Sequence, residues 1–155
     1  MTTDKNLNFI SNGIKNLGTA IFSDFSTSIL KFPTCVITIS NIDKSGNIWF
    51  HIKKPYEDIS GLEKEFSAQL QFYNKNYNYH ITAHGNATII LKENELATDQ
   101  SAGNETLIRL RIFNAEYCYS RKNGKTGSGN YINKLITWLF IDEKNDHSLN
   151  VHFNL

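Results

Sequence analysis

The chain has 155 residues, a formal net charge of +1 and 12% aromatic residues. This length allows one domain, residues 1–155, with a substantial core, and the near-neutral charge excludes the strong positive field that nucleic acid or an anionic membrane would require. No apolar run reaches membrane-spanning length and no signal-peptide pattern is present, so we expect a soluble, cytoplasmic protein.

The two cysteines, Cys35 and Cys118, lie inside strand-like patterns. We expect them to be reduced, buried small side chains, while a disulfide between them stays open on sequence grounds. His80 and His84 have the spacing that shares a metal ion on a helix, but four residues of a strand span about 13 Å. Because no Cys-x-x-Cys pair is present either, we expect no metal site.

Residues 1–17 favour an N-terminal helix that ends at Gly18. Its apolar residues recur at spacings of three and four: Leu7, Ile10, Ile14 and Leu17. Thr3 or Asp4 would cap its first turn. Residues 19–25 then predict a first strand.

Two alternating segments, residues 34–41 and 47–54, predict a hairpin at the centre of the fold. The turn between them runs from Asp43 to Gly46, and Gly46 is free to adopt a positive φ. In the second strand an apolar set alternates with a polar and aromatic set: Ile48, Phe50 and Ile52 against Trp49, His51 and Lys53. The apolar set predicts a core face. For the other set two interpretations remain: a solvent-exposed outer face, or a wall that faces a ligand.

Pro55 breaks this strand, and residues 58–66 predict a short second helix. A capping-box pattern, with Ser60 followed three residues later by Glu63, marks its start. Its apolar face comprises Ile59, Leu62 and Phe66.

Residues 68–73, 79–91 and 107–121 predict three further strands. Gly85 in the middle of the second predicts a bulge or a close backbone approach, which would form a barrel corner or leave room for a flat ligand. In the third strand the apolar phase slips near Asn114, where we expect a bulge.

Residues 122–130 predict a flexible loop, because the run Gly-Lys-Thr-Gly-Ser-Gly lacks the spacing and the βαβ context of a phosphate-binding loop. Residues 135–141 and 149–153 predict a final strand pair with a turn at 143–146. The fold class predicted from these elements is mainly β: a single antiparallel split barrel of six to eight strands with about two peripheral helices.

One combination of segments resembles a known family. It comprises Leu17-Gly18-Thr19-Ala20 with Phe22, Ile42 to Phe50 (IDKSGNIWF), the predicted helix through Phe66, Leu70 to Tyr73 (LQFY) and Ile81 to Ala87 (ITAHGNA). In this order, from Leu17 to Tyr119, the chain is similar to the pyridoxamine 5'-phosphate oxidase-like superfamily of FMN-binding split barrels. The resemblance is to its small general-stress-protein branch.

The resemblance implies a homodimer with one FMN per subunit, in a groove between the two barrels, where FMN carries out electron transfer. In relatives, a basic residue before the D-x-x-G turn and a cluster after the W-F strand hold the phosphate. Here residues 35–40 contain no basic residue, and residues 55–57 are Pro-Tyr-Glu. The expected cofactor site therefore comprises Lys53 and Lys54 as phosphate partners, with Trp49, His51 and Thr38 close to the groove.

Two functions of different class follow from this resemblance. The first is a flavoprotein that acts as an FMN-dependent oxidoreductase on an unknown substrate, with no residue assigned a catalytic role. The alternative is a split-barrel dimer that has lost FMN and serves as a non-catalytic binding or structural protein. A haem-binding variant is a third interpretation, since a histidine would offer an axial ligand.

Overall fold

The computed structural model describes residues 5–56, 58–91, 103–122, 131–139 and 152–153. They form one helix and eight strands. The elements are α1 (Lys5–Leu17), β1 (Thr19–Asp24), β2 (Cys35–Ile42), β3 (Asn47–Lys53), β4 (Glu65–Tyr73), β5 (Tyr79–Ile90), β6 (Glu105–Lys122), β7 (Tyr131–Leu139) and β8 (His152–Phe153).

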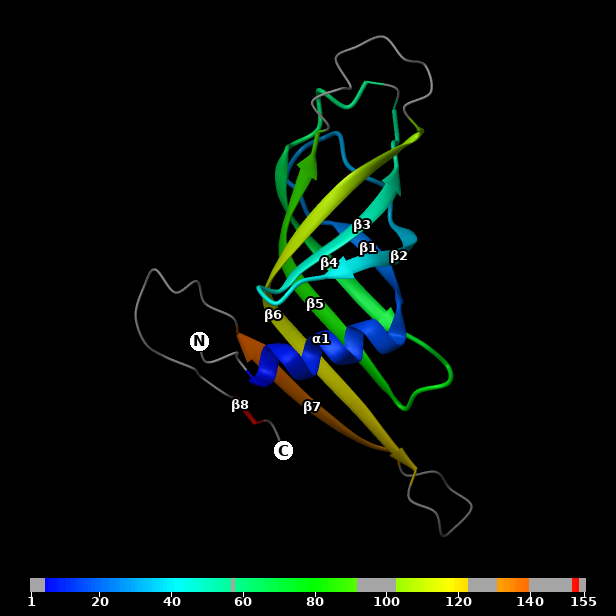
Figure 1. The fold of residues 1–155 in the computed structure, drawn as a ribbon, viewed down its shortest axis with the longest axis vertical. Helices are drawn as coiled ribbons and strands as arrows, with labels where there is room; N and C mark the ends of the chain where they lie inside the picture. The colour runs from blue at the N-terminus through cyan, green and yellow to red at the C-terminus, as the bar shows by residue number, and fades with distance from the viewer. Residues whose placement is uncertain (1–4, 57, 92–102, 123–130, 140–151, 154–155) are drawn as a thin grey trace, which may run out of the picture.

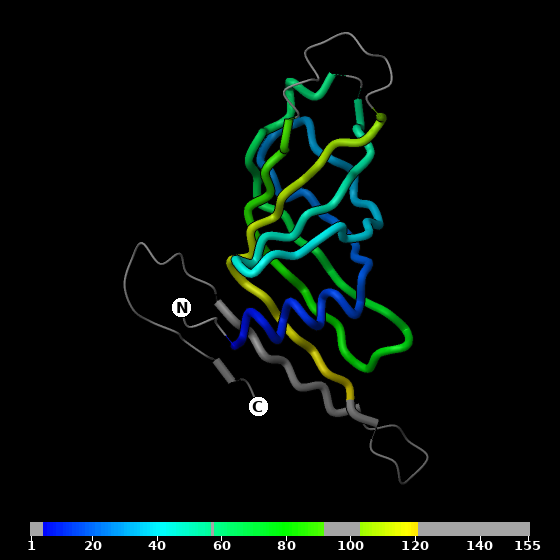
Figure 2. The backbone as a smooth tube through the Cα atoms, in the orientation of Figure 1, coloured from blue at the N-terminus to red at the C-terminus, as the bar shows by residue number. Residues whose placement is uncertain are grey.

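The strands form one antiparallel sheet in the order β3-β2-β1-β4-β5-β6-β7-β8, and an additional pairing of β3 with β6 closes the first six strands into a barrel. This arrangement confirms the predicted fold class. Figure 1 shows that β7 continues along the C-terminal part of β6, beyond the barrel. Figures 1 and 2 both show α1 crossing one end of the barrel.

Alternating apolar residues of the six barrel strands point inward and make the core. Among them, Phe22, Phe50 and Phe72 are completely buried, and the rings of Phe22 and Phe50 lie 5.6 Å apart. Truncating a buried phenylalanine costs about 3–5 kcal/mol, so these rings hold the barrel strands together.

Helix α1 covers the barrel with Ile10, Ile14 and Leu17, as its periodicity predicts. The predicted stop at Gly18 is confirmed: its φ is +76°, and its N–H donates to the carbonyl of Ile14 at 2.9 Å. This helix has 13 residues, and no described segment forms a helix with the length and hydropathy of a membrane span.

The predicted irregularity in the long strands is confirmed. The register of β5 and β6 shifts between His84 and Gly85, so that these pair with Asn114 and Ile112 and leave Phe113 unpaired. A Cβ at Gly85 would lie only 2.2 Å from the carbonyl oxygen of Arg111. The absence of a side chain at Gly85 therefore allows the two backbones to approach closely at a barrel corner.

The second helix predicted for residues 58–66 is wrong. The N–H of Ser60 donates to the Asp58 carboxylate at 2.9 Å, which forms a turn around Ser60 and Gly61 in place of a helix cap. Strand β4 already begins at Glu65, because Phe66 fits the buried positions of a strand that pairs with both β1 and β5. Tertiary pairing has overridden the local helix signal.

Cys35 and Cys118 are free, as expected, but they are only partly buried. Burial still raises the pKa of both thiols. The final strands are present as β7 and β8. The helix cap at Thr3 or Asp4, most of the predicted loop 122–130 and the turn at 143–146 lie outside the described residues.

Candidate functional site

Strand β3 separates its side chains as its alternation predicts. Ile48, Phe50 and Ile52 are buried, whereas Trp49 is partly exposed and His51 and Lys53 are exposed on the outer face. The aromatic, imidazole and ammonium groups therefore line one strip of the barrel surface.

Strand β6 adds an arginine that sequence reasoning missed. Arg109 is the cross-strand partner of Trp49, and its guanidinium carbon lies 5.8 Å from the centre of the indole ring. This is within cation–π distance. The Nε atom of Arg109 is buried, and no described group accepts a hydrogen bond from it. We call Trp49, His51, Lys53 and Arg109 the cationic face.

The D-x-x-G turn orients Trp49. The Asp43 carboxylate accepts hydrogen bonds from the backbone N–H groups of Ser45 and Asn47 at 2.8 and 3.0 Å, and from the Asn47 side-chain amide at 2.8 Å. The side chain of Trp49 also bonds to it. Burial raises the pKa of Asp43, but these hydrogen bonds outweigh it and the net pKa is lowered. Gly46 closes the turn with a φ of +79°, as predicted.

The other predicted site residues lie around this face. The Nδ1 atom of His51 is 3.4 Å from the Oγ of Ser40 on β2. Thr38 is exposed on β2 and pairs with Thr19 of β1. Lys54 follows the end of β3, is partly buried, and donates its backbone N–H to the carbonyl of Asn104 at 2.8 Å. Trp49, His51 and Lys53 thus share one strip, with Thr38 on the adjacent strand and Lys54 just beyond its end.

The signal for Arg109 is present in the sequence. Arg109 and Arg111 alternate with the buried residues Ile108, Leu110 and Ile112, which places both arginines on the outer face of β6. The pairing of β6 with β3 carries no local signal, because hairpin reasoning links only strands that follow one another.

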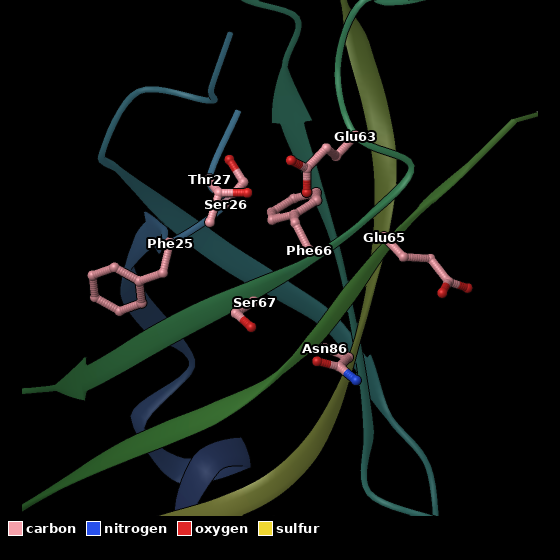
Figure 3. A pocket seen from close by; sticks show the side chains of 8 residues that line it. All are labelled: Phe25, Ser26, Thr27, Glu63, Glu65, Phe66, Ser67 and Asn86. Atoms are coloured by element: carbon pink, nitrogen blue, oxygen red, sulfur yellow. The ribbon is translucent and has the colours of Figure 1, made fainter. Parts of the chain in front are cut away.

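A pocket of about 360 Å³ lies on the same outer surface, at β4 and β5 (Figure 3). It is lined by Phe25, Ser26, Thr27, Glu63, Glu65, Phe66, Ser67 and Asn86. We call it the acidic pocket. Its Glu65 pairs with Thr88, and Thr88 pairs with Arg109, so the pocket and the cationic face share a cross-strand row. Among the described residues, no three His, Cys, Asp or Glu side chains gather to hold a metal ion.

No protein-family model and no curated protein matches the sequence. Solved structures do match. A pyridoxamine 5'-phosphate oxidase-related, FMN-binding protein from Nostoc punctiforme aligns with a TM-score of 0.59 at 7% identity, over 96% of this chain and 94% of that one. PhzG from Burkholderia lata 383, in complex with tetrahydrophenazine-1-carboxylic acid, aligns with a TM-score of 0.57 at 13% identity, over 97% and 90%.

A third structure, the general stress FMN/FAD-binding protein of Xanthomonas citri, aligns with a TM-score of 0.54 at 16% identity, over 81% of this chain and 96% of that one. The chain has the fold of the pyridoxamine 5'-phosphate oxidase-like split barrels. At these identities the likeness extends to the fold of the split barrel.

Proposed function

We propose that this split barrel is an FMN-binding flavoprotein whose ligand lies against the cationic face. The observation that carries the proposal is the pair Trp49 and Arg109: a partly exposed aromatic ring beside a guanidinium whose buried Nε has no described acceptor. The guanidinium supplies a planar, permanently charged surface beside that ring.

The residues present fit the two chemical parts of FMN. A planar ring system needs an aromatic or guanidinium surface, which Trp49 and Arg109 supply. A phosphate dianion needs cations or convergent N–H donors, and Lys53 and Lys54 lie at the end of the same strand. Glu105, the cross-strand partner of Lys53, works against an anion there. Four groups favour FMN and one opposes it.

When bound, FMN supplies the chemistry of one- and two-electron transfer. The work of the chain is then to bind and orient the ring and the phosphate. We propose that it does so as an oxidoreductase, on a substrate that the described residues do not specify. The fold of FMN-binding proteins supports this step, and no catalytic residue is assigned.

We also propose a homodimer. Ile21 on β1 and Val36 on β2 are cross-strand partners on the outer face, and 44% and 74% of their surfaces are exposed. A second copy of the chain that covered this pair would remove apolar surface from water. Sedimentation at micromolar concentration is expected to give the mass of two chains, and a monomer would contradict the proposal.

The second candidate function is a split barrel that has lost FMN and serves as a binding or structural dimer. Strand β2 carries no basic residue, and Glu105 opposes Lys53. These two observations favour this alternative, and purified protein without yellow colour would support it.

Titration with FMN, followed by flavin fluorescence, tests the proposal. We expect saturable binding by the wild type, and binding about ten- to a hundredfold weaker in the double variant Lys53→Ala/Lys54→Ala, because charge-assisted hydrogen bonds contribute about 1.5–3 kcal/mol. Lys75→Ala, in the exposed turn after β4, is the matched control and is expected to bind like the wild type.

Unchanged affinity in the double variant would remove both lysines from the site. Absence of binding by the wild type would reject the proposal in favour of the cofactor-free alternative.

A further inference from the structure

The turn between β2 and β3, residues 43–46, is covered by the first turn of helix α1. Gly46 is buried, although it lies at the tip of a hairpin. A Cβ placed on Gly46 would lie 3.1 Å from Cδ1 and 3.6 Å from Cδ2 of Leu7, so the leucine packs directly on the glycine backbone. Figure 1 shows the N-terminal end of α1 and this turn at the same side of the molecule. Helix α1 therefore holds the tip of the hairpin in place.

Gly46 stands between the two backbone donors that hold the Asp43 carboxylate. The N–H groups of Ser45 and Asn47 donate to this carboxylate at 2.8 and 3.0 Å. The N–H of Gly46 donates to the carbonyl of Asp43 at 3.2 Å, and its own carbonyl accepts the N–H of Ile112 at 3.0 Å. Because glycine is conformationally permissive, these contacts and the packing of α1 fix its backbone. The same packing thereby restrains the two donors on either side of it.

The Asp43 carboxylate connects this turn to the cationic face. The side chain of Trp49 bonds to it, and the indole ring lies 5.8 Å from the guanidinium carbon of Arg109. A partly exposed indole can adopt several rotamers, and a hydrogen bond to a fixed acceptor selects one of them. The contacts from α1 through the turn to the indole are continuous, so a change at one end can reach the other.

We propose that Leu7 is a positioning residue for the Trp49 indole. By packing on Gly46 it holds the carboxylate of Asp43, and that carboxylate holds the indole in the orientation that a planar ligand of the cationic face requires. An indole turned away from this orientation would offer such a ligand less surface. The inference rests on the proposed function only for the identity of the ligand, because the orientation of the indole can be measured in the absence of any ligand.

Two-dimensional ¹H–¹⁵N NMR of the full chain tests this role, because each of its two tryptophans gives one indole N–H signal. The variant Trp49→Phe identifies the signal of Trp49. Asp43→Asn, which offers a neutral and weaker acceptor, is expected to shift that signal. Leu7→Ala is expected to shift it in the same direction and to weaken FMN binding about threefold. Leu7→Met keeps the apolar volume and is expected to restore both properties.

A double variant tests the path through the carboxylate. If Leu7 acts through Asp43, the substitution Leu7→Ala shifts the indole signal less in the Asp43→Asn background than in the wild type. The matched control is Ile14→Val, which trims a fully buried residue about 10 Å further along the same helix. It is expected to lower the midpoint of thermal unfolding while the indole signal and the FMN affinity stay as in the wild type.

An unmoved indole signal in Leu7→Ala would overturn the proposal. So would an equal shift in Ile14→Val, additive shifts in the double variant, or a shifted signal with unchanged FMN affinity. Thermal unfolding shows whether each variant is folded, and the milder truncation Leu7→Val takes the place of Leu7→Ala if that variant is unfolded. Absence of FMN binding by the wild type would reject the proposed function alone, because the indole signal still decides whether Leu7 positions Trp49.

Discussion

The cationic face and the acidic pocket occupy the same outer surface of one barrel, yet they offer opposite chemistry. The cross-strand row that contains Trp49 and Arg109 continues through Thr88 to Glu65. Arginine and glutamate are thus separated by one intervening strand, at a spacing of about 4.8 Å per strand. A net charge of +1 conceals this segregation.

The difference teaches that strand register distributes charge over a barrel surface. Arg109 and Glu65 are far apart in the chain, and only the pairing of β4, β5 and β6 brings them into one row. The first of four predictions concerns the strand pairing that both regions share. The other three concern the cationic face and its surroundings.

The largest loss of stability is expected for Gly85→Ala, which would disrupt the pairing of β5 with β6. A Cβ at this position would lie 2.2 Å from the Arg111 carbonyl oxygen and 2.7 Å from Leu110, and a backbone atom cannot yield as a flexible side chain does. We expect a loss of at least about 3 kcal/mol in the free energy of unfolding, measured with urea. Gly103→Ala, where a Cβ meets nothing within 4 Å, is the control and is expected to change stability by less than about 0.5 kcal/mol. Equal effects of the two substitutions would contradict the close approach.

The second effect concerns the cationic face alone. Arg109→Gln removes the guanidinium beside Trp49 and is expected to weaken FMN binding about tenfold, or about 1.4 kcal/mol. Arg109→Lys keeps the charge but not the planar group, so its FMN affinity is expected to fall between the two. Unchanged FMN affinity in Arg109→Gln would remove the guanidinium from the flavin site.

The third effect concerns the anchor of Trp49. Asp43→Asn keeps the shape of the turn but removes the charge that accepts its hydrogen bonds, and we expect a loss of about 1 kcal/mol at pH 7. Because folding lowers the pKa of Asp43, its contribution to stability is present above the ordinary aspartate pKa of about 3.9 and disappears as the pH falls through the folded value. Urea unfolding of both proteins between pH 7 and pH 3 is expected to show the two stabilities converging below pH 4. A constant difference down to pH 3 would reject this role for the charge.

The smallest effect is expected for Ser40→Ala. Its hydroxyl lies 3.4 Å from Nδ1 of His51, and the pair is exposed to solvent. A hydrogen bond of this length in water contributes little to stability. We expect a change below about 0.5 kcal/mol in the free energy of unfolding and no change in FMN affinity. A loss above 1 kcal/mol would show that the imidazole is held more firmly than its exposure indicates.

Much of the barrel was predictable, because its signals are local. Alternation identified the inner face of β3, and glycine chemistry located the stop at Gly18 and the turn at Gly46. The close approach at Gly85 and the phase slip near Asn114 were also visible, since a missing side chain and a broken alternation are properties of one strand.

The candidate site was predictable only in part, because it depends on pairings between distant strands. The pattern showed Trp49 and its neighbours on an outer face, but it could not show that Arg109 lies beside the indole. The acidic pocket was hidden by the incorrect helix at residues 58–66, which separated Glu63 from Ser26. The Asp58 carboxylate accepts the N–H of Ser60, which favours a turn over the helix start that the capping-box pattern predicts. Helix propensity alone does not distinguish these two local structures.

The unpaired Phe113 has a consequence for how the molecule opens. Before it, β6 lies between β3 and β5 and belongs to a closed ring of strands; after it, β6 lies between β5 and β7 in an open extension. Amide protons of residues 106–112 are thus shielded within a ring that has no edge, while those of β7 depend on fewer partners. Hydrogen exchange is therefore expected to be slow throughout the ring of strands and faster in β7, the outer strand of the extension.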